Sequence, residues 1–197
     1  IQITVNAAQQ QGGGGNCNGR SYTAIPGGDG GYYNVHSLAP GDTLFLDGNY
    51  TYKYIYLYDR SGTASCPIVI TNKNGIAKLR RDQLNMVDCK YIKVSGNGGG
   101  QQYGIDIRGR NNDTLWNGGF GINISGKSKC VEISNVQIRN MGIGIKVGTN
   151  GDCDDSYNFP NWTIDSISIH DNKIVKIWNE GMYLGNTSPD NTANGYD

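Results

Sequence analysis

Apolar and polar residues alternate in short runs along most of the chain beyond residue 37, as in Thr43–Leu46, Ile105–Arg108 and Val136–Arg139. Because successive side chains of a strand point to opposite faces, such runs predict strands with one buried face. Gly or Asn stands at the ends of most runs, where tight turns favour residues that tolerate a left-handed backbone. We find no convincing segment of helical length with a 3.6-residue period in this region, so we expect an all-β protein.

The expected strands are short and follow one another closely, separated by turn residues. They are Thr43–Leu46, Tyr50–Tyr58, Pro67–Thr71, Tyr91–Val94, Ile105–Arg108, Gly121–Ser125, Val131–Ile133, Val136–Arg139, Ile143–Val147, Ile164–Ile169, Ile174–Trp178 and Met182–Leu184.

The later strands repeat as a group. Val131–Asn140 can be laid over Ile164–Asn172, with an Asn at the corner of each segment. Short strands, tight corners and repetition predict a parallel β-helix, in which each turn of the chain stacks on the one before it. An antiparallel sandwich is the alternative; it needs longer strands, and the Asn-Gly pairs in the chain are suited to its hairpins.

Composition and charge narrow the classes of protein. Gly accounts for 30 of the 197 residues, and hydrophobic residues for 37 %, a share too high for a disordered chain. Lys+Arg and Asp+Glu number 17 each, so the chain lacks the basic excess of a typical nucleic-acid binder. No apolar run approaches the length of a membrane-spanning helix. We therefore expect neither a nucleic-acid partner nor a transmembrane segment.

Leu38–Tyr50 (LAPGDTLFLDGNY) is the most diagnostic stretch of the chain. Together with Gly62–Ile70 it resembles the opening of secreted right-handed parallel β-helix proteins, which include chondroitinase-B-like and alginate-lyase-like polysaccharide lyases. Asn179–Pro189 resembles a rung of β-helix repeat proteins exported to the cell surface in Bacteroidetes, many of them type IX secretion cargo. The resemblance covers roughly residues 38–185 and implies a secreted or cell-surface protein with a right-handed coil.

Two parts are expected along the chain. Residues 1–36 form an N-terminal strand followed by a Gly-rich cap or linker, and residues 37–197 form a partial parallel β-helix. Asn186–Asp197 has the composition of a loop and directly follows the last expected strand. We therefore expect the β-helix to be incomplete at its C-terminus.

Three of the five cysteines, Cys66, Cys89 and Cys130, each stand at the entry to an expected strand. If these strands are successive rungs, Cys66 and Cys89 lie about 4.8 Å apart, within the range of a disulfide. The alternative is a column of buried free thiols at one corner of the coil. The cysteines form no CxxC pair and have no His cluster nearby, which argues against a zinc or thioredoxin-like site.

Five tyrosines occupy every second position of one expected strand: Tyr50, Tyr52, Tyr54, Tyr56 and Tyr58. In a continuous strand their rings lie on one face, with Ile55 and Leu57 on the other. Flat amphipathic rings suit stacking on a sugar or docking of another protein. The alternative is that the rings pack beneath the N-terminal segment and cap the first rung, because a solenoid needs its end closed.

The catalytic candidates are dispersed along the chain. Lyase action on uronic acids needs a group that neutralises the carboxylate, often Ca²⁺ or Arg, and a base such as Lys, Arg or His. The complete lyase pattern is absent, so no catalytic residue carries over from the resemblance. The candidates are Arg139 and Lys146 on one expected rung, and His170, Lys173, Lys176 and Glu180 on the next.

A candidate calcium site lies in the polar insertion between two expected strands. Asp152, Asp154 and Asp155 supply carboxylate oxygens of the kind that Ca²⁺ prefers, without the full spacing of an EF-hand. A solvated loop is the alternative interpretation.

Two classes of function follow from these features. The first is an exported, non-enzymatic surface protein that contacts a glycan, a surface partner or the secretion machinery through the tyrosines and the strand faces. The second is a polysaccharide lyase or glycoside hydrolase acting on an acidic polysaccharide, with its active residues on strands 131–184. Convergence of acidic and basic side chains from adjacent rungs in one cleft would favour the second.

Overall fold

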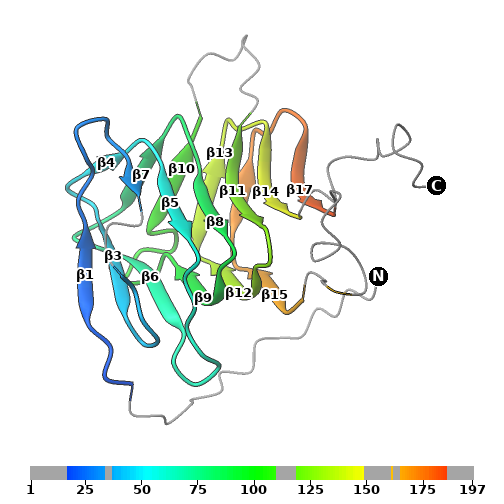
Figure 1. The fold of residues 1–197 in the computed structure, drawn as a ribbon. Helices are drawn as coiled ribbons and strands as arrows, with labels where there is room; N and C mark the ends of the chain where they lie inside the picture. The colour runs from blue at the N-terminus through cyan, green and yellow to red at the C-terminus, as the bar shows by residue number, and fades with distance from the viewer. Residues whose placement is uncertain (1–16, 34–36, 110–118, 149–160, 162–164, 186–197) are drawn as a thin grey trace.

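The computed structural model describes residues 17–33, 37–109, 119–148, 161 and 165–185 (Figure 1). Strands and turns account for the regular structure of these residues, and none of them is helical. The described residues consequently include no helix that could cross a membrane. The all-β prediction is confirmed for the described part of the chain.

The strands form three sheets. Sheet A consists of β1 (Ser21–Ala24), β3 (Thr43–Asp47), β6 (Ile68–Lys73), β9 (Lys90–Ser95), β12 (Lys129–Ser134) and β15 (Ile167–His170). Sheet B consists of β2 (Tyr32–Tyr33), β5 (Ile55–Tyr58), β8 (Leu84–Val87), β11 (Phe120–Ser125), β14 (Ile143–Val147) and β17 (Glu180–Leu184). Sheet C consists of β4 (Thr51–Tyr52), β7 (Ala77–Arg80), β10 (Ile105–Arg108), β13 (Val136–Arg139) and β16 (Lys173–Val175).

From β3 onward the chain visits the sheets in the order A, then C, then B, and we call three such successive strands a coil. Each strand pairs in parallel with its counterparts in the neighbouring coils, so the coils stack along one axis (Figure 1). Parallel pairing of short strands is compatible with the expected β-helix. It contradicts the antiparallel sandwich, because the pairing is parallel in all three sheets.

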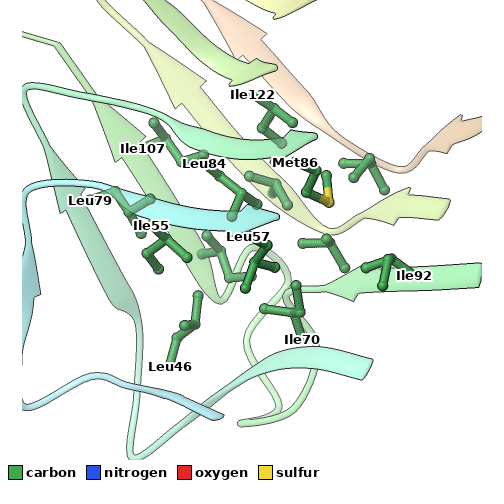
Figure 2. Packing of buried hydrophobic residues seen from close by; sticks show 14 of the residues in the cluster. Leu46, Ile55, Leu57, Ile70, Leu79, Leu84, Met86, Ile92, Ile107 and Ile122 are labelled. Carbon is green, nitrogen blue, oxygen red and sulfur yellow. The ribbon is translucent and has the colours of Figure 1, made fainter. Parts of the chain in front are cut away.

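The hydrophobic core lies inside the stack, between the three sheets (Figure 2). In sheet B, Leu57, Met86, Ile124 and Val147 occupy the same position of successive coils and form one buried column. Burial of a Leu, Ile or Met side chain contributes about 1.5–3 kcal/mol. The alternating apolar positions seen in the sequence therefore supply the main stabilising contacts between coils.

Several strands lie outside the expected ranges. β7 and β8 were not expected, and β1 and β2 fall within the segment that we expected to be a cap or linker. β1 pairs with β3, and β2 pairs with β5, so this part of residues 1–36 extends sheets A and B. Residues 1–16 and 186–197 lie outside the described part of the chain.

The corners use a left-handed backbone, as the abundance of Gly and Asn indicates. Asn74, Asn135 and Asn140 have φ angles of 54°, 56° and 54°. The overlay of Asn140 on Asn172 is wrong, however. The amide of Asn140 donates to the carbonyl oxygen of Lys176, which also has a φ of 54° and occupies the equivalent corner of the next coil.

The disulfide joins Cys17 to Cys66, whose Cα atoms lie 5.7 Å apart. The predicted Cys66–Cys89 bond is therefore wrong, and Cys89 is a free thiol. Cys89 is fully buried, with its Sγ 3.6 Å from the carbonyl oxygen of Leu57, while Cys66 lies closer to the surface. Burial raises the pKa of the Cys89 thiol to about 11. Neighbouring coils place two cysteines close together, but their side chains must also point toward each other to bond.

Candidate functional site

The five alternate tyrosines do not share one face. β4 ends at Tyr52 and β5 begins at Ile55, so the corner at Lys53 and Tyr54 interrupts the expected strand 50–58. Tyr52 is fully buried and Tyr54 nearly so, whereas Tyr56 and Tyr58 lie on the outer face of β5. The prediction of a single exposed ladder is wrong because the corner changes which side of the chain faces the core.

Tyr52 instead covers the first coil. Its Oη donates to the carbonyl oxygen of Ala24 in β1 and accepts from the amide of Asp47 in β3, both at 2.9 Å. Burial raises the pKa of Tyr52 to about 12, so the hydroxyl stays protonated and keeps both contacts. The capping interpretation therefore holds for this ring.

Tyr54 stabilises the turn between β1 and β2 through a hydrogen bond. Its hydroxyl donates to a carboxylate oxygen of Asp29, and Asp29 also accepts from the amide of Gly31 at 3.0 Å. Burial of the ring and the hydrogen bond to Asp29 raise the pKa of Tyr54 above its usual range. Tyr52 and Tyr54 are thus structural residues, and neither is exposed enough to carry the predicted contact with a ligand.

The accessible rings form a cluster on the outer face of sheet B, at its N-terminal end. Tyr33 of β2 lies 5.2 Å from Tyr56, measured between ring centroids, and Tyr56 lies 6.2 Å from Tyr58. Tyr33 is 50 % exposed and Tyr58 is 41 % exposed. Edge-to-face packing of this kind holds aromatic rings in place at little entropic cost. A rigid aromatic surface results, with two rings open to solvent.

Polar side chains continue this surface along the same face of sheet B. The strand register aligns one outward position of six successive strands, β2, β5, β8, β11, β14 and β17. With a spacing of about 4.8 Å between strands, the positions span about 24 Å. We call this set the sheet B column. It consists of Tyr33, Tyr56, Asn85, Asn123, Lys146 and Tyr183.

Two amides occupy the middle of the sheet B column. The Asn123 Nδ2 donates to the Asn85 Oδ1 at 2.6 Å and lies 3.3 Å from the Ser125 Oγ. The Asn123 Oδ1 is buried and has no hydrogen-bond partner in the described structure. An unsatisfied buried acceptor costs free energy, and a hydroxyl donor from a ligand would remove that cost.

Lys146 lies next to the amides in the sheet B column. Its Nζ sits 5.1 Å from the centroid of the Phe120 ring, at the start of β11. The residue is largely buried, and burial lowers the pKa of its amine. A partly desolvated amine beside two amides and an aromatic ring is suited to hydrogen bonding with a polar ligand.

The predicted catalytic candidates do not come together. The coil assignment was right, because Arg139 and Lys146 share one coil, and His170, Lys173 and Glu180 share the next, as does Lys176, which directly follows β16. However, they lie on three different sheets: His170 on sheet A, Arg139 and Lys173 on sheet C, Lys146 and Glu180 on sheet B. No hydrogen bond or ion pair joins any two of these six candidates in the described structure. These candidates therefore do not supply the convergence in one cleft that would favour a lyase or hydrolase.

Two of these candidates have well-defined partners elsewhere. The Arg139 Nη2 lies 2.9 Å from the Asp106 Oδ2. The His170 Nε2 lies 3.4 Å from the Glu132 Oε1, and its Nδ1 lies 2.8 Å from the Asp171 Oδ2. Each group belongs to an ion-pair network on the outer face of its own sheet, which is a common arrangement for surface residues.

Asp152, Asp154 and Asp155 lie outside the described residues, so the predicted calcium site stays a prediction. Within the described ranges, no three His, Cys, Asp or Glu side chains are grouped as metal ligands.

Sequence reasoning did not identify Tyr33, Asn85 or Asn123 as site residues. Each belongs to a different coil, and the connections between the strands vary in length, so no fixed spacing in the sequence aligns them. Asn85 carried a further obstacle, because its strand β8 was not expected. Only the strand register reveals that these side chains are neighbours.

Comparison with known proteins gives no relative from which a role could be transferred. The chain matches no family model, no curated protein and no solved structure.

Proposed function

We propose that this protein is an exported, secreted or cell-surface β-helix protein that binds a glycan along the outer face of sheet B. The observation that carries the proposal is the sheet B column, in which tyrosine rings, amides and an amine lie in register on the outer face of six strands. Tyrosine rings stack on the apolar faces of sugars, while amides accept from and donate to sugar hydroxyls. A repeating polymer can meet the same chemistry at successive coils.

The buried Asn123 Oδ1 supports a ligand with hydroxyl groups. This acceptor lacks a partner in the described structure, and its residue lies between Asn85 and Lys146 in the sheet B column. A sugar hydroxyl donating to it would satisfy the orphaned atom. A purely apolar protein partner would leave it unsatisfied, so a saccharide is the better match.

Export is supported by the Cys17–Cys66 disulfide, because such bonds persist in oxidising compartments outside the cytoplasm. We propose the type IX secretion route from the resemblance of Asn179–Pro189 alone. We also propose a right-handed winding, since crossover connections between parallel strands of one sheet are right-handed in nearly all proteins.

Binding of purified protein to neutral polysaccharides, followed by isothermal titration calorimetry, tests the proposal. Tyr33→Ala and Asn123→Ala should each weaken binding about tenfold, the loss expected for one stacking ring or one buried hydrogen bond. Tyr50→Ala is the matched control, because Tyr50 is also exposed but lies outside the sheet B column. Equal losses for Tyr33→Ala and Tyr50→Ala would contradict the assignment of the site.

The catalytic alternative is tested in the same samples. A lyase acting on a uronate polysaccharide generates an unsaturated product that absorbs ultraviolet light, whereas a binding protein leaves the absorbance unchanged. Hydrolysis would appear as new reducing ends. Turnover of either kind that is abolished by His170→Ala or Lys146→Ala would replace the binding proposal with an enzymatic one.

A further inference from the structure

The outer face of sheet C carries a ladder of arginines that has no counterpart on the other two sheets. Arg80 of β7 is in register with Arg108 of β10, which in turn is in register with Arg139 of β13. The three side chains therefore follow one another at intervals of about 4.8 Å. We call them the arginine ladder.

A second outward column runs beside the arginine ladder and adds positive charge. Its members, taken in strand order from β4 to β16, are Thr51, Lys78, Asp106, Gln137 and Lys173. Together the two columns hold five cationic side chains and one carboxylate. Lys78 and Lys173 are exposed, which places the surplus charge at the protein surface.

Both oxygens of the single carboxylate, that of Asp106, already accept hydrogen bonds from neighbouring side chains. The Asp106 Oδ2 lies 2.7 Å from the Arg80 Nη2 and 2.9 Å from the Arg139 Nη2. Its Oδ1 accepts from the Gln137 Nε2 at 3.0 Å and from the Arg139 Nε at 3.2 Å. Burial raises the pKa of Asp106, but the hydrogen bonds from Arg139 and Gln137 and the two positive charges outweigh burial and hold the pKa below its usual value. Asp106 therefore orients Arg80 and Arg139 and has no capacity left for a third guanidinium.

Arg108 is the member of the arginine ladder that does not pair with Asp106. Its Nε is buried and has no hydrogen-bond partner in the described structure. Arg80 and Arg139 both turn toward Asp106, and Arg108 lies between them in the ladder. Like charges opposite one another on neighbouring strands are destabilising. A folded protein that keeps such a group gains stability when an anion binds to it.

On the outer face of sheet A, two carboxylates each have a lysine of their own. There, Lys93 pairs with Glu132 at 2.8 Å, and Lys73 lies 4.0 Å from Asp47. Each carboxylate on that face meets one lysine across a neighbouring strand. On sheet C one carboxylate serves two arginines, and the cations exceed the anions. Sheet A also carries Lys90 and Lys129 in register with each other, so what distinguishes sheet C is its three aligned guanidinium groups around one carboxylate.

We propose that the outer face of sheet C is a second ligand site, which binds a polysaccharide bearing carboxylate or sulfate groups, with Arg108 as a direct contact. The planar guanidinium donates two parallel hydrogen bonds to such groups. The ladder spans about 10 Å, so successive acidic groups of one polymer can reach different arginines. The site is separate from the sheet B column, and its ligand is recognised by charge instead of by stacking.

A nucleic acid also presents repeated anions, but the molecule is a poor match for it. Lys+Arg and Asp+Glu balance over the chain, so it lacks the overall basic excess of a typical nucleic-acid binder. The disulfide further favours an extracytoplasmic setting, where acidic polysaccharides are the abundant polyanions. We therefore assign the site to a saccharide.

Binding of polygalacturonate and dextran sulfate, with neutral dextran and duplex DNA as comparisons, tests the proposal on the full chain. Wild-type protein should bind the two acidic polysaccharides in a salt-sensitive manner and more tightly than neutral dextran at the same salt concentration. Arg108→Ala should weaken this binding tenfold or more, roughly the effect of one charge-assisted contact. Arg108→Lys should lose less, because the charge remains while the paired donors do not.

Thermal unfolding separates a ligand contact from a structural role. Because Arg108 has like-charged neighbours and its Nε lacks a partner, Arg108→Ala should unfold at the wild-type temperature or above it. Lys129→Ala, which removes one positive charge from the start of β12 on sheet A, should leave binding of the acidic polysaccharides within twofold of wild type. A marked fall in unfolding temperature for Arg108→Ala would show that the residue serves the fold.

Three binding results would overturn the proposal. These are tighter binding of DNA than of either acidic polysaccharide, equal binding of charged and neutral polymers, and unchanged affinity in Arg108→Ala. The outcome is independent of the sheet B proposal. Loss of the sheet C site should leave binding of neutral glycans intact, and Tyr33→Ala should leave the salt-sensitive binding intact.

Discussion

The two ends of the stack treat equivalent side chains differently. Leu57 and Leu184 occupy the same column of sheet B, in the first and last complete coils of the described structure. Leu57 is fully buried, whereas Leu184 is 50 % exposed. Met182, the other inward residue of β17, is 52 % exposed. A leucine at this inward position therefore buries much more apolar surface at the N-terminal end of the described stack than at the C-terminal end.

Contacts specific to the N-terminal end account for the difference. The disulfide ties Cys17 to Cys66, Tyr52 fills the space beside β1, and Arg20 pairs with Asp42 at 3.1 Å. None of these contacts recurs from coil to coil. Stacking supplies each inner coil with two neighbours, but a terminal coil has only one and needs separate contacts to close it.

Among the changes that test this comparison, removal of the disulfide should cause the largest loss of stability. With Cys17→Ser and Cys66→Ser combined, the free energy of unfolding should fall by about 4 kcal/mol, as expected from the entropy of the released chain for a separation of 49 residues. Denaturant unfolding measures the loss. Cys130→Ser alters a free thiol and should change stability by less than about 0.5 kcal/mol. Equal stability of the double variant and wild type would show that the bond does not close this end.

The leucine pair tests the comparison most directly. Leu57→Ala should lower the free energy of unfolding by about 3 kcal/mol, because it opens a cavity in the closed end. Leu184→Ala removes the same atoms from a half-exposed position and should cost less than about 1 kcal/mol. Denaturation curves of the two variants, measured side by side, give the difference. Similar losses at both positions would mean that the last coil is as well covered as the first.

Loss of the Tyr52 hydroxyl should have a moderate effect. Tyr52→Phe keeps the ring but leaves the carbonyl of Ala24 and the amide of Asp47 without a partner, which should cost about 2 kcal/mol. Thermal and denaturant unfolding both report this loss. Tyr50→Phe removes a hydroxyl from a partly exposed ring and serves as the control. A stable Tyr52→Phe variant would show that the ring alone closes the coil.

Protonation of Asp42 at low pH should cause the smallest loss of stability. Burial raises the pKa of Asp42, but hydrogen bonds from the Ala39 and Arg20 amides and from the Arg20 guanidinium outweigh burial and lower the pKa overall. A lowered native pKa means that the ionised carboxylate stabilises the fold above the unfolded value of about 3.9. This contribution should disappear as the pH falls through the native pKa.

Stability measured from pH 7 down to pH 2 for wild type and Asp42→Asn checks this expectation. The wild type should be the more stable protein at pH 7, and the gap between the two should narrow on acidification. A gap that is constant with pH would contradict the role of the ionised carboxylate at the N-terminal end.

Much of the fold could be predicted from local pattern. Segments such as Val136–Arg139 and Ile143–Val147 alternate clearly and contain β-branched residues, and both form strands with the predicted bounds. β7 and β8 escaped prediction because their sequences, AKLR and LNMV, hold a single β-branched residue between them. Their extended conformation is set by pairing with β10 and β11, which a local pattern does not reveal.

Less of the candidate sites could be predicted. Tyr56, Tyr58, Lys146 and Arg139 were identified from residue type, and all four lie on outer faces. Asp106 and Arg108 were not identified, although both are visible in the expected strand Ile105–Arg108. Their significance lies in their neighbours on β7 and β13, which are distant in sequence.

The sequence by itself determined that this is a β-rich chain of short strands with Gly and Asn at corners, because alternation and turn preference act between adjacent residues. Only the tertiary structure decided which residues became neighbours across coils: Cys17 with Cys66, Asn85 with Asn123, and the three arginines of the ladder. Lateral contacts depend on the length of each coil and on how each corner turns its side chains. Insertions of varying length break any constant period, so these contacts exist only once the coils have stacked.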